Sequence, residues 1–149
     1  MAKLQVSWNP FDPADPGPCI RVIVMNTREA IEAGREIGLE YPEPHSITAL
    51  LDTGSPFTIV SKTFAKNRKL VLTNAGMPIR TMGGDCSCDE YSGSVSFPGS
   101  DLPTIAVLRI RAADFNQEPF FSCIIGRDVL RNWDVCFDGR ARRVTISAL

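Results

Sequence analysis

The pattern of apolar and polar positions predicts many short β-strands and little helix. Runs rich in Val, Ile, Leu and Thr recur along the chain, and residues typical of turns separate them. The predicted strands are residues 19–25, 46–51, 57–60, 69–73, 91–97, 104–110, 120–125, 135–137 and 143–146. Short strands at close spacing, with turn residues between them, are typical of an all-β barrel or sandwich. We therefore expect an all-β fold.

Helix signals are few. Residues 27–38 predict a helix, because Thr27 suits the N-cap and Glu29 lies in the first turn, where the helix dipole favours an acidic side chain. Residues 61–68 and residues 128–133 each predict one short helix. The fold should therefore contain minor helical elements beside its strands.

Glycine and proline predict the turns. Gly83 and Gly84 lie between extended flanks within residues 79–94, which predicts a β-hairpin. Residues 74–78, Asn-Ala-Gly-Met-Pro, predict a turn. The last two predicted strands flank Asp138-Gly139, so we expect the chain to finish in a second hairpin.

The N-terminal segment is rich in proline. Four prolines follow Trp8 and precede Cys19, namely Pro10, Pro13, Pro16 and Pro18. Proline fixes φ and has no N–H to donate, which excludes a helix or a central strand here. We therefore divide the chain into a proline-rich arm, residues 1–18, and one domain, residues 19–149.

Length and charge narrow the class of protein. The chain has 149 residues, 44% of them hydrophobic, and a formal net charge of −1. A nearly neutral chain gives no electrostatic reason to expect a nucleic acid or an anionic membrane as partner. No apolar run approaches the roughly 20 residues that span a bilayer, and the first residues lack the apolar segment of a signal peptide. We expect a cytoplasmic protein.

The five cysteines do not suggest a disulfide framework, because their number is odd. They are Cys19, Cys86, Cys88, Cys123 and Cys136. The Cys86-x-Cys88 pair could supply half of a zinc site, and a zinc-binding protein is one alternative. No second pair stands at ligand spacing, and the chain has a single histidine. We therefore expect reduced thiols, no metal and no cofactor.

Two stretches carry the candidate chemistry. In the first, an apolar run ends in Asp52-Thr53-Gly54-Ser55. About 70 residues later, a second apolar run ends in Gly-Arg-Asp and leads into a short predicted helix. The Asp-Thr-Gly tripeptide alone is weak evidence, since chance places it in about a few per cent of chains of this length. A strand followed by an ordinary turn is the simplest interpretation. The apolar run before Asp52 and the later Gly-Arg-Asp stretch favour a functional site instead.

Together these stretches resemble the retropepsin family, the retroviral aspartic proteases and their single-domain bacterial relatives. Residues 49–55 resemble the catalytic loop of that family, and residues 124–130 resemble its second signature, with Ile125, Gly126, Arg127 and Asp128 as structural residues. The resemblance implies a half-pepsin closed barrel with one or two short helices. The resemblance also places the flap, a hairpin that closes over substrate, at Met82, Gly83 and Gly84.

The resemblance implies a role for each residue of the first stretch. Asp52 would be the catalytic carboxylate, and the Thr53 hydroxyl would link the two active-site loops of a dimer. Gly54 would present its backbone to substrate, and Ser55 would support the site. Peptide hydrolysis without metal or covalent intermediate needs a base to activate water and an acid to protonate the leaving nitrogen. Two adjacent carboxylates that share one proton provide both.

One chain supplies one such aspartate. The other candidates lack the Thr-Gly that follows Asp52; they are Asp85, Asp89, Asp128 and Asp138. The expected protein is therefore a symmetric homodimer with its site on the two-fold axis, an aspartic endopeptidase acting on a peptide or protein. The alternative is a dimerisation or peptide-binding module of the same fold with weak or no catalysis.

Two positions differ from the retroviral pattern. Ser55 stands where those enzymes usually carry Ala, and we expect its hydroxyl to donate a hydrogen bond to Asp52 and so favour the ionised carboxylate. Pro56 and Phe57 stand where those enzymes carry acidic residues. Arg127 is therefore expected to lack an ion-pair partner, and the adjoining subsites should be more apolar.

Overall fold

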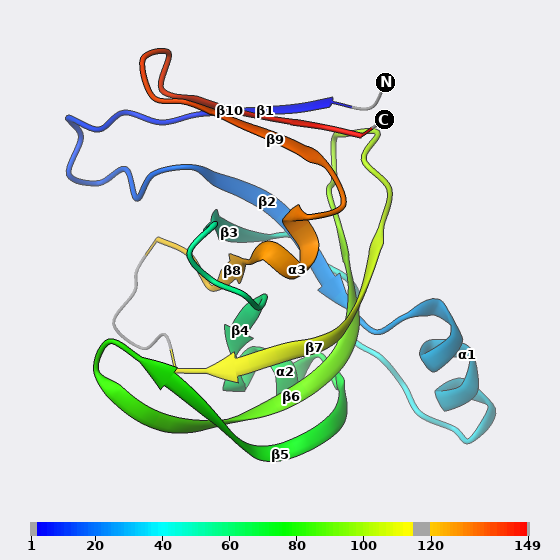
Figure 1. Cartoon of the computed structure of the whole chain (residues 1–149). Helices are drawn as coiled ribbons and strands as arrows, with labels where there is room; N and C mark the ends of the chain where they lie inside the picture. The colour runs from blue at the N-terminus through cyan, green and yellow to red at the C-terminus, as the bar shows by residue number, and fades with distance from the viewer. Residues whose placement is uncertain (1–2, 115–119, 149) are drawn as a thin grey trace.

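A computed structural model describes residues 3–114 and 120–148, which form ten strands in two sheets and three helices (Figure 1). The strands are β1 (Lys3–Ser7), β2 (Cys19–Met25), β3 (Ile47–Leu51), β4 (Ile59–Ser61), β5 (Val71–Thr81), β6 (Gly84–Ser96), β7 (Ile105–Ala113), β8 (Cys123–Ile125), β9 (Asp134–Asp138) and β10 (Arg143–Ser147). The helices are α1 (Arg28–Glu36), α2 (Lys62–Asn67) and α3 (Arg127–Leu130). The expected mostly-β composition is confirmed.

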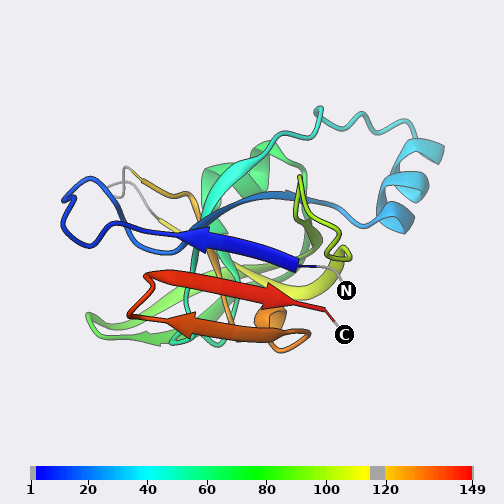
Figure 2. The same ribbon diagram turned by 90° about the horizontal axis from the view of Figure 1, so that it is seen from above.

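The smaller sheet has the order β1-β10-β9, and both of its strand pairs are antiparallel. The expected C-terminal hairpin, β9–β10, is therefore confirmed. Figures 1 and 2 show the two ends of the chain side by side at one edge of the molecule. The predicted arm contributes β1 as an edge strand, and its prolines follow in the turns that lead to β2. Residues 1–2 of the predicted arm, and residues 115–119 and 149 of the predicted domain, lie outside the described residues.

The larger sheet has the order β2-β3-β8-β4-β7-β6-β5, with an additional pairing of β2 with β6. The central strands of this sheet form both kinds of pairing, because β8 runs parallel to β3 and antiparallel to β4. The register places Leu51 opposite Ile125. The last residues of β3 and β8 therefore lie side by side, and the loops that follow these two strands start next to each other.

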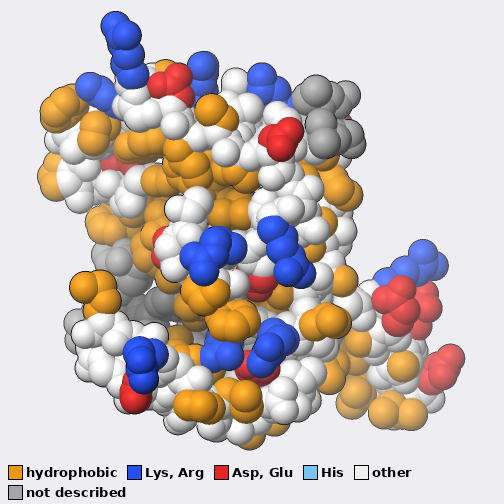
Figure 3. Space-filling model, in the orientation of Figure 1, with side chains coloured by type: hydrophobic (Ala, Val, Ile, Leu, Met, Phe, Trp, Pro, Cys, Tyr) orange, Lys and Arg blue, Asp and Glu red, His pale blue; other side chains and the backbone are white. Residues whose placement is uncertain are grey.

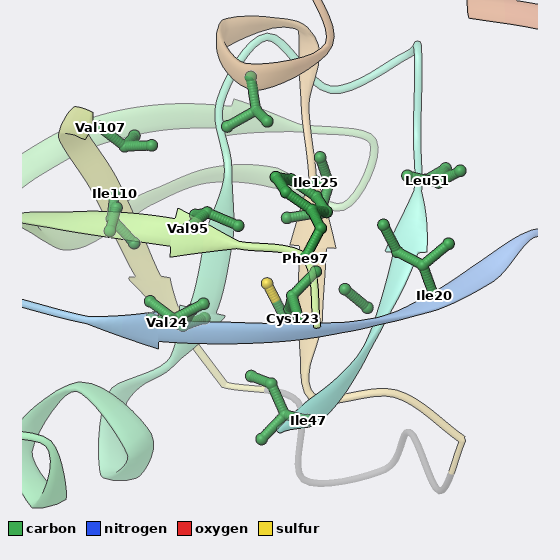
Figure 4. Packing of buried hydrophobic residues seen from close by; sticks show 14 of the residues in the cluster. Ile20, Val24, Ile47, Leu51, Val95, Phe97, Val107, Ile110, Cys123 and Ile125 are labelled. Atoms are coloured by element: carbon green, nitrogen blue, oxygen red, sulfur yellow. The ribbon is translucent and has the colours of Figure 1, made fainter. Parts of the chain in front are cut away.

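Strand alternation builds the core. Ile47, Ala49 and Leu51 are buried in β3, while the residues between them are only partly buried. In β8, Cys123 and Ile125 are buried in the same way. Figure 4 shows side chains from β2, β3, β6, β7 and β8 converging on one cluster. This burial fixes which face of β3 points inward, since a slip of one residue would turn every apolar side chain outward.

The helices and hairpins mostly follow the predictions. Helix α1 lies within predicted residues 27–38, and the Thr27 hydroxyl accepts a hydrogen bond from Ala30 N, as an N-cap does. The β5–β6 hairpin is confirmed. The turn predicted at residues 74–78 is wrong, because these residues belong to β5. The register with β6 shifts on both sides of Asn74, so the turn-like residues form an irregularity within the strand. Among the described residues, no helix is long and apolar enough to cross a membrane.

A buried acidic residue lies in the larger sheet. The Glu90 side chain, on β6, is fully buried, and Arg111 Nη2 on the neighbouring β7 lies 3.0 Å from Glu90 Oε1. Arg109 and Asn74 donate further hydrogen bonds to the same carboxylate. Burial by itself would raise the pKa of Glu90, but these hydrogen bonds and the two guanidinium charges outweigh it and hold the pKa below its ordinary value. Sequence patterns did not predict this cluster.

Replacing Glu90 by Gln should lower stability at neutral pH and weaken its dependence on acid. Because the folded pKa is lowered, the carboxylate stabilises the fold fully above the unfolded pKa of about 4.3. That contribution is lost as the pH falls through the lower folded value. The variant lacks this contribution and leaves Arg111 buried without a countercharge, which should cost about 3 kcal/mol at neutral pH.

Urea unfolding of wild type and Glu90→Gln at neutral pH and at about pH 3 measures both effects. Glu43→Gln, at an exposed glutamate, is the matched control. Equal stability of the Glu90 variant and wild type at neutral pH would contradict the prediction.

Candidate active site

Asp52 lies in the first position after β3, in a turn that the neighbouring strand holds. Its backbone N–H donates to Ile125 O at 3.0 Å, which extends the pairing of β3 with β8 by one residue. The N–H of Gly54 donates to Asp52 Oδ1 at 2.8 Å. Asp52 is half-buried, and Thr53 and Gly54 are exposed. The carboxylate is thus oriented by the turn of its own loop and is accessible at the surface of the single chain.

The stretch after β8 braces this loop. Arg127 N donates to Ser55 O at 2.9 Å, and Arg127 Nη1 donates to Thr53 O at 2.8 Å. Gly126 lies so close to the loop that a Cβ there would collide with the backbone carbonyl of Phe57. Only a residue without a side chain allows this approach. The structure therefore brings the two predicted stretches into direct contact.

A second set of hydrogen bonds joins the loop to α3. Asp128 accepts from Thr58 N at 2.9 Å and from Thr58 Oγ1 at 2.8 Å. The same hydroxyl accepts from Gly126 N at 3.3 Å, and Thr58 is fully buried. Sequence reasoning named Asp128 but missed Thr58. Its one signal was a lone hydroxyl residue within the apolar run of residues 57–60, because a buried hydroxyl needs a partner.

One prediction about this loop is wrong. The Ser55 hydroxyl donates to Phe57 O at 2.6 Å, whereas we expected it to donate to the carboxylate of Asp52. The loop turns back on itself between these residues, so the nearest acceptor is a backbone carbonyl. The Ser55 hydroxyl therefore fixes the shape of the loop by bonding its backbone.

The arginine of the second signature has a backbone partner. Among residues 3–114 and 120–148, no carboxylate lies within ion-pair distance of Arg127. Its guanidinium binds the Thr53 carbonyl instead. Phe57 lies under the guanidinium of Arg111, which is 4.1 Å from the ring centroid. This side of the loop is thus bordered by an aromatic ring and arginines.

The predicted flap residues lie at the tip of the β5–β6 hairpin, where Met82 and Gly83 form the turn and Gly84 begins β6. Thr81 Oγ1 donates to Gly84 O at 2.8 Å, and Gly84 has a φ of 113°, which favours glycine. Met82 at the tip is completely exposed. The tip points to the same side of the molecule as the loop after β3 (Figure 1). No hydrogen bond within the described part of the chain joins this turn to Asp52.

Cys86 and Cys88 lie on the same hairpin. Cys86 is exposed, and Cys88 is buried next to Arg111. Burial raises the pKa of the Cys88 thiol, against the opposing effect of Arg111. Within the described ranges, no group of three or more His, Cys, Asp or Glu side chains is arranged to hold a metal.

Gly126→Ala should destabilise the protein, because the new methyl group would meet the Phe57 carbonyl and the backbone must move. We expect a loss of about 3 kcal/mol or more in the free energy of unfolding, measured by urea denaturation. Gly139→Ala is the matched control, since nothing lies within 4 Å of a Cβ at that position. Equal stability of the two variants would contradict the close approach of Gly126 to the loop.

Ser55→Ala should cost about 1 kcal/mol of stability, because it removes one hydrogen bond within the loop. Urea denaturation measures the loss. The variant Ser55→Thr retains a hydroxyl and should recover part of it. No loss in Ser55→Ala would show that the hydrogen bond to Phe57 O does not stabilise the loop.

Comparison with known proteins finds a similarity of fold to a solved structure. No protein-family model and no curated protein sequence matches the chain. Among solved structures, the chain is similar to a retropepsin-like aspartic protease from Rickettsia conorii, with a TM-score of 0.60 and 12% sequence identity. The match covers 98% of this chain and 90% of the other. At this identity the likeness shows the fold alone, so the chain has a fold similar to that of retropepsin-like proteases over nearly its whole length.

Proposed function

We propose that this chain is an aspartic endopeptidase that hydrolyses peptide bonds as a symmetric homodimer. The observation that carries the proposal is the setting of Asp52. The carboxylate stands at the end of β3 in an exposed Asp-Thr-Gly turn, and Gly54 N orients one of its oxygens. This turn occurs in a chain whose fold is similar to that of a retropepsin-like aspartic protease.

The chemistry requires two carboxylates. In the dimer, Asp52 and its copy would share one proton, because two charges so close together cannot both ionise. The ionised carboxylate would accept a proton from the attacking water. The protonated carboxylate would donate a hydrogen bond to the substrate carbonyl and then a proton to the leaving nitrogen. The protonation states would belong to the pair and not to one residue.

The contacts of the other four candidate aspartates support a second Asp52 from a partner. Asp85 pairs with an arginine of its own hairpin. Asp89, Asp128 and Asp138 each accept a hydrogen bond from a backbone N–H group. Each therefore has a structural partner in its own part of the chain. A copy of the chain is the simplest source of the second carboxylate, and the exposed Thr53 and Gly54 leave the loop open to it.

The β5–β6 hairpin would act as the flap. An extended peptide would bind as an additional strand between this hairpin and the loop of Asp52. The exposed Met82 side chain would then lose water contact against the peptide or against the partner's hairpin. The additional β2–β6 pairing supports a closed barrel as the scaffold that holds these parts.

Asp52→Asn should abolish peptide cleavage and leave the dimer intact. The amide keeps the shape of the side chain and cannot act as base or acid, so we expect a loss of about three orders of magnitude or more in kcat. A set of fluorogenic peptides measures cleavage, and analytical ultracentrifugation measures the oligomeric state. Asp101→Asn, at an exposed aspartate outside the loop, is the matched control.

Two outcomes would reject the proposal. Cleavage by Asp52→Asn at the wild-type rate would place the chemistry elsewhere. A wild-type dimer that cleaves no peptide between acidic and neutral pH would favour the alternative, a dimerisation or peptide-binding module of this fold.

A further inference from the structure

A cavity of about 520 Å³ lies beside the loop that carries Asp52. One wall is formed by Pro56 and Phe57 of the loop, another by residues 106–109 of β7, and a third by α3 and Arg131, which follows it. Cavities of roughly 300–1,000 Å³ hold small ligands or parts of larger ones. Asp52 does not line this cavity, so the cavity adjoins the candidate active site without being part of its reacting centre.

Two arginines at one wall have no countercharge. Among the described residues, no carboxylate lies within ion-pair distance of Arg127 or Arg131. Asp128 also lines the cavity, and its oxygens already accept hydrogen bonds from Thr58 N and Oγ1. The charge of Asp128 lowers the positive potential of the cavity. Asp128 forms no ion pair with Arg127 or Arg131.

The β7 wall adds another guanidinium group, that of the half-exposed Arg109. Arg109 shares the buried carboxylate of Glu90 with Arg111, and neither Glu90 nor Arg111 lines the cavity. The residues that line the cavity therefore carry three guanidinium groups and one carboxylate, that of Asp128. Figure 3 shows the result at the surface, where Lys and Arg side chains gather in the middle of the face over α3 and β7.

Apolar groups lie between these charges. Pro56, Phe57 and Leu108 line the cavity, and the Leu108 side chain is 74% exposed. The guanidinium of Arg111 lies over the Phe57 ring, 4.1 Å from the ring centroid. A cavity with apolar walls and unpaired guanidinium groups suits a side chain with an aliphatic stem and an anionic head.

We propose that this cavity, the arginine cavity, binds an anionic side chain of the peptide substrate at a position away from the cleaved bond. Pro56 follows Asp52 by four residues on the same loop, so a peptide lying along the loop passes from one to the other. The proposal rests on the peptidase function only for the expectation that the ligand is a peptide. Glutamate and phosphoserine carry the shared anionic chemistry, and the experiment distinguishes them.

Binding to the full-length Asp52→Asn variant tests the cavity without catalysis. The probes are fluorescein-labelled octapeptides with an apolar centre, in which one Glu is moved from position to position, with Gln and phosphoserine peptides in parallel. Fluorescence anisotropy at low salt, with peptide up to millimolar concentration, should show one position at which Glu binds about tenfold tighter than Gln. Added salt should reduce this preference, because it screens the guanidinium charges.

Arg131→Gln in the same background should reduce the preference for Glu about two- to fivefold. Arg131 is chosen because Arg127 also holds the Thr53 carbonyl and Arg109 also pairs with Glu90. Arg140→Gln, at an exposed arginine in the β9–β10 turn, is the matched control and should leave the preference unchanged. Tighter binding of phosphoserine than of Glu at the same position would identify a phosphate as the preferred head group.

Equal binding of Glu and Gln peptides at every position, or no binding of any of them, would overturn the proposal. So would a preference that Arg131→Gln leaves unchanged. Cleavage by the wild-type chain is measured separately. A preference for Glu without wild-type cleavage would reject the peptidase and keep the cavity, whereas cleavage without the preference would reject the cavity and keep the peptidase.

Discussion

The candidate site depends on the parallel pairing of β3 with β8. This pairing places Leu51 opposite Ile125, so that Asp52 and Gly126 begin their loops side by side. The loops can then touch only because Gly126 has no side chain. Parallel strands require a crossover connection, and here the chain between β3 and β8 contains β4 to β7, which build most of the remaining sheet and the hairpin. The pairing of β3 with β8 thus determines the positions of the Asp52 carboxylate, of the residues after β8 that contact its loop, and of the β5–β6 hairpin.

Two polar clusters, each with a buried member, stiffen the surroundings of the Asp52 loop; the buried members are Thr58 and Glu90. Asp128 accepts both donors of Thr58, and Glu90 takes the charge of Arg111. Arg111 also connects them, because its backbone N–H donates to Thr58 O. Buried polar groups of this kind stabilise one arrangement of the chain, since any other arrangement would leave a buried donor or charge without a partner. The chain itself therefore holds the Asp52 loop in a defined shape.

The residues after Ser55, together with the arginines near them, determine the charge and polarity beside the loop. The loop continues into Pro56 and Phe57, which are uncharged, so the arginines nearby receive no countercharge from these two positions. Two of those arginines turn to other partners: Arg127 to a backbone carbonyl, and Arg111 to an aromatic face and a buried glutamate. Beside the loop lies a cavity whose lining is partly apolar and carries three guanidinium groups and one carboxylate.

The sequence by itself determined the class of fold, most strands, a helix within residues 27–38 and the hairpin at Gly83 and Gly84. These follow from local preferences, namely alternation, capping and the backbone freedom of glycine, which act over a few residues. The resemblance of two stretches to the retropepsin family also identified the segments that meet, because both motifs can be read directly from the sequence. Only the tertiary structure decided that Thr58 faces Asp128, that Ser55 bonds a carbonyl, and that Glu90 is buried between arginines. Those partners lie on different strands, and a polar side chain takes whichever partner the folded chain places within reach.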